Sequence, residues 1–199
     1  MNFLTKAELY ERVEAIRRNF SDADPFDPFS AAEKLHIKVE YYLMESSRFG
    51  GALFRDGERA LIVINSSKSK ESRRFIACHE LIHYFLHKSE NSFCCDENSP
   101  SVMEWQANEG AAELLIPYKK FLLFYGNIRS LYMTDPERAV QRLANEFSVS
   151  TAMIRNRFES LSPEIAQLEE GRAISEIEVI SKTKAAPKRC STVDVFADE

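Results

Sequence analysis

The segment RRFIACHELIHYFLHK, residues 73–88, places two histidines inside the apolar face of a predicted helix. His79 and His83 are one helical turn apart, about 40° from each other around the axis. A buried imidazole without a partner costs about 1–3 kcal/mol, so each ring needs a hydrogen-bond partner or a metal ion. In an H-E-x-x-H helix both rings can bind one ion, while the glutamate between them, here Glu80, acts as a general base.

We therefore predict that His79 and His83 bind zinc and that Glu80 is the catalytic residue. Zinc would lower the pKa of its bound water, and Glu80 would take the proton as that water attacks a carbonyl. The alternative is a pair of core histidines that hydrogen bond to the backbone or to a carboxylate.

A catalytic zinc ion needs a third protein ligand and an open position for water. The longer motif H-E-x-x-H-x-x-G-x-x-H is excluded, because Leu86 and Ser89 stand at its glycine and its last histidine. His87 is four residues beyond His83, but it lies about 12 Å along a straight helix from His79. We expect His87 to support the site from behind or to lie at the surface.

The third ligand is expected on the next predicted helix, SVMEWQANEGAAELLIP, residues 101–117. Glu104 is the best candidate, because the small residues that follow it allow this helix to approach the H-E-x-x-H helix closely. The result would be a site of two histidines and one glutamate, which suits zinc. The other acidic candidates are Asp96, Glu97, Glu109 and Glu113.

Several other elements must position these residues. Thr5 and Glu8 form a capping-box pattern at the start of an amphipathic helix. A strand is predicted at 37–42, and an Asp-Gly pair joins two strands near 51–55 and 59–64 into a hairpin that leads to the H-E-x-x-H helix. The first hairpin strand could hold an extended peptide beside the site.

The predicted fold class is α+β. We expect a mainly helical domain with a small antiparallel sheet, made of a strand plus a hairpin, packed beside the H-E-x-x-H helix. A helix-turn-helix-like pair follows near 135–161, joined at FSVS. Residues 1–161 are assigned to a zinc metallopeptidase domain, and residues 162–199 to a polar C-terminal tail that is partly disordered.

Composition points to one soluble domain in the cytoplasm. The chain has 199 residues, of which 44% are hydrophobic and 29% charged. Its apolar runs are far shorter than the roughly 20 residues that span a bilayer, and its N-terminus lacks a signal-peptide core, so no membrane partner is expected. Four cysteines without C-x-x-C spacing suggest reduced thiols, and the adjacent Cys94 and Cys95 are read as loop thiols rather than a redox or metal element.

A net charge of −5 argues against stable binding of the protein to nucleic acid. The charge is uneven, however, because residues 119–160 carry seven Lys or Arg and only four Asp or Glu. Arg155 and Arg157 lie in this basic stretch, within the predicted helical pair.

Four segments together resemble the ImmA/IrrE family of metallopeptidases. They are DPFSAAEKLHIKV, VINSSKSKESRRFIACHELIHYFLH, EWQANEGAAELLIP and LANEFSVSTAMIRNRFESL, and they extend over roughly residues 27–161. The compact phage-type and mobile-element branch is the closer match. Ile82 stands where the family often has Gly, Gly110 where it usually has a bulky aromatic residue, and His36 where a Gly commonly ends the short helix.

The resemblance implies a zinc endopeptidase of the gluzincin type, with His79, His83 and Glu104 as ligands and Glu80 as base. It also implies a protein substrate, namely a helix-turn-helix transcriptional repressor of a phage, mobile element or stress operon, which would make the enzyme an anti-repressor. The alternative function is a non-proteolytic regulator that binds a repressor or DNA through the same fold. The intact Glu80 favours the enzyme, because a pure binding protein needs no base.

Overall fold

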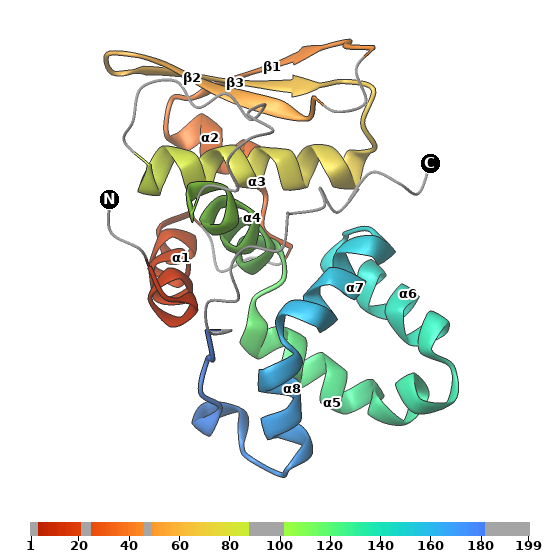
Figure 1. Ribbon diagram of the computed structural model, residues 1–199. Helices are drawn as coiled ribbons and strands as arrows, with labels where there is room; N and C mark the ends of the chain where they lie inside the picture. The colour runs from red at the N-terminus through yellow and green to blue at the C-terminus, as the bar shows by residue number, and fades with distance from the viewer. Residues whose placement is uncertain (1–3, 21–24, 46–48, 88–101, 182–199) are drawn as a thin grey trace.

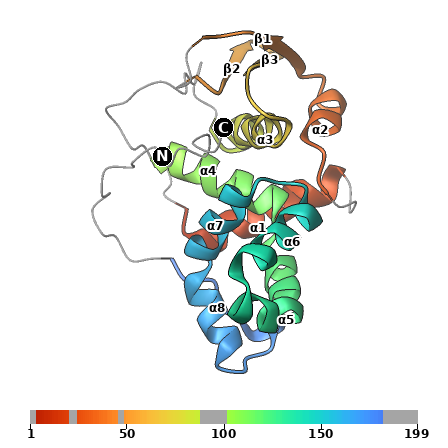
Figure 2. The same cartoon turned by 90° about the vertical axis from the view of Figure 1, so that its right-hand side faces the viewer.

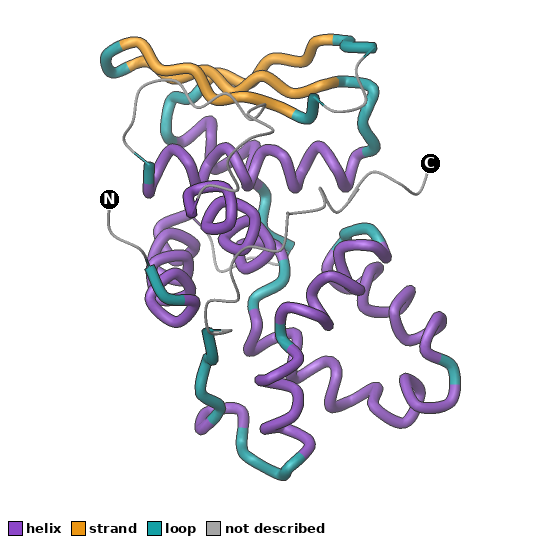
Figure 3. The backbone as a smooth tube through the Cα atoms, viewed as in Figure 1, coloured by secondary structure: helices purple, strands orange, loops and turns teal. Residues whose placement is uncertain are grey.

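A small sheet and a helical body enclose one central helix. The computed structural model describes residues 4–20, 25–45, 49–87 and 102–181. The sheet covers one side of α3 (Lys70–Leu86), and α4 (Val102–Leu115) crosses its other side (Figure 1). Figure 2 views α3 along its axis, between these two layers. Figure 3 shows the strands gathered at one end of the molecule, with helices forming the rest, so the predicted α+β class is confirmed.

The other helices surround this centre. They are α1 (Lys6–Phe20), α2 (Pro28–Lys34), α5 (Tyr118–Thr134), α6 (Pro136–Phe147), α7 (Thr151–Ser160) and α8 (Ser162–Glu169), followed by a 3-10 turn (Ile174–Glu176). The predicted capping box is present at α1, where the Thr5 backbone N–H donates to the Glu8 carboxylate over 2.8 Å. Helices α6 and α7 are the predicted pair.

The sheet has three strands in the order β1-β3-β2. Strands β2 (Gly51–Asp56) and β3 (Arg59–Asn65) form the predicted antiparallel hairpin, whereas β1 (Lys38–Tyr42) pairs with β3 in parallel. The sheet is therefore mixed rather than wholly antiparallel. Consecutive strands β1 and β2 do run in opposite directions, but β3 lies between them and so runs parallel to β1.

Helix α3 lies directly under the hairpin. Its start is capped by Ser69, whose hydroxyl accepts a hydrogen bond from the Ser72 backbone N–H. Gly51 of strand β2 lies so close to α3 that an added Cβ atom would come within 2.4 Å of Ile76 Cγ2 and 2.8 Å of the Val63 carbonyl oxygen. A side chain at residue 51 would push the sheet away from α3.

The departures from the family pattern have a structural account. A Cβ atom on Gly110 of α4 would lie 3.0 Å from the side chain of Ile82 on α3. The Ile82 side chain therefore occupies the space that a side chain at position 110 would need, so a large residue at 82 goes with a glycine at 110. His36 follows α2 with a φ of 55°, in the left-handed region that favours glycine.

Two segments differ from the sequence expectations. The sequence analysis predicts no helix at the 17-residue α5, although this segment contains the apolar run FLLFY. Residues 162–199 were expected to form a polar, partly disordered tail, but its first eight residues form helix α8, in which the Glu164 side chain is fully buried. The rest of that predicted tail, residues 182–199, lies outside the described part of the chain.

Buried ion pairs join the N-terminal and C-terminal helices. Arg157 of α7 is fully buried and donates to Glu109 over 2.8 Å, to Glu113 and to the Tyr10 hydroxyl, which brings α1, α4 and α7 together. Lys6 lies 3.0 Å from the Glu164 carboxylate, which links α1 to α8. These ion pairs therefore link α1, α4, α7 and α8 to one another.

Two helical glycines provide a matched test of the α3–α4 contact. Gly126→Ala in α5, where no atom lies within 4 Å of the added Cβ, should stabilise the protein by about 0.5–1 kcal/mol through helix propensity. Gly110→Ala should bring no such gain, because Ile82 must move. Urea unfolding measures both free energies, and an equal gain in the two variants would contradict the close contact.

Candidate metal centre

Three residues from two helices converge on one point. His79 and His83 come from α3 and Glu104 from the first turn of α4, and each offers a ligand atom within 4.8 Å of the others. The two Nε2 atoms are 3.0 Å apart. The Glu104 carboxylate reaches both rings, with one oxygen 3.3 Å from His79 Nε2 and the other 3.3 Å from His83 Nε2. These residues can hold one metal ion.

The chemistry of this donor set fits a divalent cation. His79 Nδ1 donates to the Asn108 side-chain oxygen over 3.0 Å, so a neutral ring carries its lone pair on Nε2, the atom that faces Glu104. Burial lowers the pKa of His83, which favours the neutral form that a metal requires. Burial would raise the pKa of Glu104, but its contacts with His79 and His83 outweigh this and hold that pKa below its usual range.

Glu80 lies beside this cluster and points toward the hairpin. Its side chain is buried, and burial raises its pKa to about 7. The Leu53 backbone hydrogen bonds to the carboxylate, whereas Oε2 has no hydrogen-bond partner among the described residues. A buried carboxylate with one unengaged oxygen is suited to accept a proton from a bound molecule.

Comparison with known families supports a peptidase. Residues 32–159 match the IrrE N-terminal-like domain of the Peptidase_M78 family, which covers more than half of the chain. The chain belongs to the Peptidase_M78 family. This confirms the resemblance to the ImmA/IrrE metallopeptidases. No curated protein matches the chain closely enough to add a relative.

Two of the other acidic candidates lie elsewhere in this Peptidase_M78 fold. Glu109 and Glu113 are on α4, but both carboxylates contact Arg157 on the side of the helix that faces α1 and α7. Asp96 and Glu97 lie outside the described residues. Within the described structure, Glu104 is the acid that joins the two histidines.

Sequence reasoning missed residues that support the site. Asn108 was not singled out, although it follows Glu104 by four residues, a spacing that puts both on the same helix face. Arg55, at the end of β2, donates from one nitrogen to the carbonyl oxygens of His83 at 3.0 Å and Tyr84 at 2.7 Å. Backbone carbonyls at a helix end attract a cation, but a sequence alone does not show which cation reaches them.

Removal of the α4 carboxylate should abolish metal binding. Glu104→Ala leaves two imidazoles, too few to retain a divalent ion through dialysis, so metal content measured by plasma mass spectrometry should fall from about one ion per chain to near zero. Glu71→Ala, the same change in the first turn of α3 and away from the buried ion pairs, is the matched control and should retain the ion. Full retention of the ion by Glu104→Ala would contradict its role as a ligand.

Proposed function

We propose that this protein is a zinc-dependent endopeptidase. The observation that carries the proposal is the convergence of His79, His83 and Glu104 beside the buried carboxylate of Glu80, in a chain of a peptidase family. Two imidazoles, one carboxylate and an open position are the usual protein environment of a hydrolytic zinc ion. His79, His83 and Glu104 are proposed as ligands and Glu80 as the catalytic residue.

Glu80 carries the proton chemistry of this proposal. A zinc ion held at the site would polarise the substrate carbonyl and make a water molecule acidic enough to attack it near neutral pH. Glu80 Oε2 accepts the proton of the attacking water and then donates it to the leaving amine nitrogen. Because burial raises the pKa of Glu80 to about 7, the group can both accept and release a proton near neutral pH.

The hairpin offers a place for the substrate backbone. Strand β2 is at the edge of the described sheet, since β3 pairs with it on one side only. The hydrogen bond from the Leu53 backbone to Glu80 brings this strand to the catalytic carboxylate. An extended peptide that adds to β2 as a further strand would present its backbone beside Glu80.

The proposed substrate is a helix-turn-helix transcriptional repressor in the cytoplasm. Its support is the family: a peptidase acts on a protein substrate, and the ImmA/IrrE resemblance points to repressors. The described helices include no candidate for a bilayer-spanning segment.

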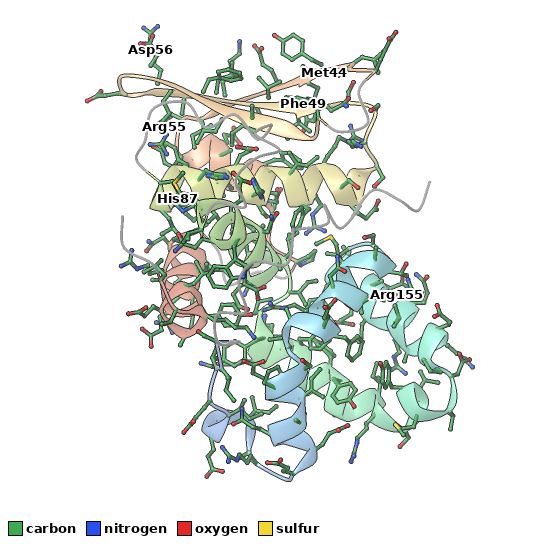
Figure 4. The ribbon with its side chains drawn as sticks, viewed as in Figure 1. Met44, Phe49, Arg55, Asp56, His87 and Arg155 are labelled. Carbon is green, nitrogen blue, oxygen red and sulfur yellow. The ribbon has the colours of Figure 1, made fainter. Side chains whose placement is uncertain are left out.

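A second candidate is a regulator that binds a repressor or DNA without cleavage. This candidate rests on the basic stretch at 119–160. The ion pairs of two arginines in that stretch argue against it. Arg157 is buried against Glu109 and Glu113, and Arg155 forms an ion pair with Glu137 (Figure 4 labels Arg155). Arg157 is therefore unavailable to a phosphate, and Arg155 shares its charge with a neighbouring carboxylate at the surface.

The Glu80→Gln variant separates the two functions. The amide keeps the size of the side chain but accepts no proton, so cleavage of purified helix-turn-helix repressors should fall by at least about 10²-fold while zinc content stays at the parent level. Electrophoresis and mass spectrometry of the fragments measure the rate. Glu71→Gln, the same change in the first turn of α3, is the control and should cleave normally.

The same variant decides between the functions in cells. If Glu80→Gln relieved repression as well as the parent, cleavage would not be the mechanism, and the binding regulator would take its place.

A further inference from the structure

A row of buried polar side chains continues behind His83. His83 Nδ1, the nitrogen that faces away from Glu104, lies 2.9 Å from His87 Nδ1. His87 Nε2 in turn lies 2.9 Å from the side-chain oxygen of Gln106 on α4. All three side chains are buried, and Figure 4 shows His87 at the end of α3. Neither Gln106 nor His87 is among the proposed ligands or the proposed base.

The direction of the hydrogen bonds follows from the amide oxygen. An amide oxygen only accepts, so the proton of a neutral His87 ring must be on Nε2. His87 Nδ1 then has no proton and accepts, and the donor across the 2.9 Å contact must be His83 Nδ1. A neutral His83 ring that is protonated on Nδ1 has its lone pair on Nε2, which faces Glu104 and His79.

We infer that His87 and Gln106 are positioning residues that fix His83 in the tautomer that can bind a metal through Nε2. The reverse order of donors would place the proton on His83 Nε2 and block the ligand atom. Asn108 fixes the tautomer of His79 directly, because its side-chain oxygen accepts a hydrogen bond from His79 Nδ1. The ligand Glu104 and both amides, Gln106 and Asn108, belong to α4, so docking of this one helix supplies the third ligand and selects both tautomers.

The surroundings of His87 hold its ring in place. Its backbone N–H donates to the His83 carbonyl over 3.0 Å, and its own carbonyl accepts from Arg55 over 3.3 Å. The His83 and His87 rings meet edge to face, with their centroids 4.9 Å apart. Three elements therefore orient the His87 ring, namely strand β2, the end of α3, and α4. His87 itself lies too far along the helix to be a ligand.

This inference rests on the proposed metal site, but its first test needs no activity. Long-range ¹H–¹⁵N spectra of the full, zinc-loaded chain show which ring nitrogen of each histidine carries a proton. Zinc is used because, without it, the Glu104 carboxylate would itself attract a proton to His83 Nε2. The chain has four histidines, so single substitutions assign the signals. His87 should be protonated on Nε2, with its Nδ1 accepting from His83 Nδ1. A proton on Nδ1 of His87 in the parent would overturn the inference.

The second test uses zinc affinity, measured by competition with a chromogenic chelator. His87→Leu removes the acceptor, and zinc should bind about 10- to 100-fold more weakly, the scale for loss of a partner behind a ligand. His87→Asn places an amide oxygen near the former Nδ1 position, so its affinity should stay within about threefold of the parent. If His87 only fills the core, leucine would serve at least as well as asparagine, and that order would refute the inference.

A second pair of variants covers a failure of His87→Leu to fold. Gln106→Glu keeps an accepting oxygen at His87 Nε2 and should preserve both the tautomer of His87 and zinc binding, whereas Gln106→Leu should release that tautomer and weaken zinc binding by no more than His87→Leu does. Equal affinity in these two variants would also refute the inference. A chain that binds zinc with this pattern but cleaves no repressor would refute the proposed peptidase and leave the positioning role standing.

Discussion

The close contact between α3 and α4 is the constraint on which the rest of the structure depends. The two histidines come from one helix and the carboxylate from the other, so the distance between the helices sets the geometry of the site. Ala107 and Ala111 are fully buried on α4, and a Cβ atom on Gly110 would lie 3.0 Å from the Ile82 side chain and force it to move. Small residues on this face are the reason that a carboxylate in the first turn of α4 reaches both imidazoles.

The opposite face of α4 holds the helix in place through charge. Glu109 and Glu113 share Arg157, and the Tyr10 hydroxyl completes this buried group. Burial of these charges costs desolvation energy, which mutual attraction and hydrogen bonds offset only where the geometry is good. Such a group specifies one position of α4 more strictly than apolar contacts would. The helix is thereby held on two sides, with Glu104 beside His79 and His83.

The sequence predicted what local patterns determine. Alternation around Asp56-Gly57 gave the hairpin, and the spacing of His79 and His83 placed two imidazoles on one helix face. Glu104 could be preferred over the other four acids because small residues near it indicate that its helix packs closely against a neighbour. Features that depend on contacts distant in the chain were missed. Three features can be predicted only when it is known which elements pack together. They are the position of β3 between β1 and β2, the burial of Arg157, and the contact between His87 and Gln106.

Zinc K-edge X-ray absorption on the zinc-loaded chain tests the central claim most directly, because it reports the atoms that surround the ion. A site made by α3 and α4 predicts two imidazole nitrogens, with oxygen as the remaining ligands, at about 2.0–2.2 Å and without sulfur. A sulfur shell at about 2.3 Å, or a spectrum without imidazole scattering, would contradict it by placing the ion on cysteines or on other groups.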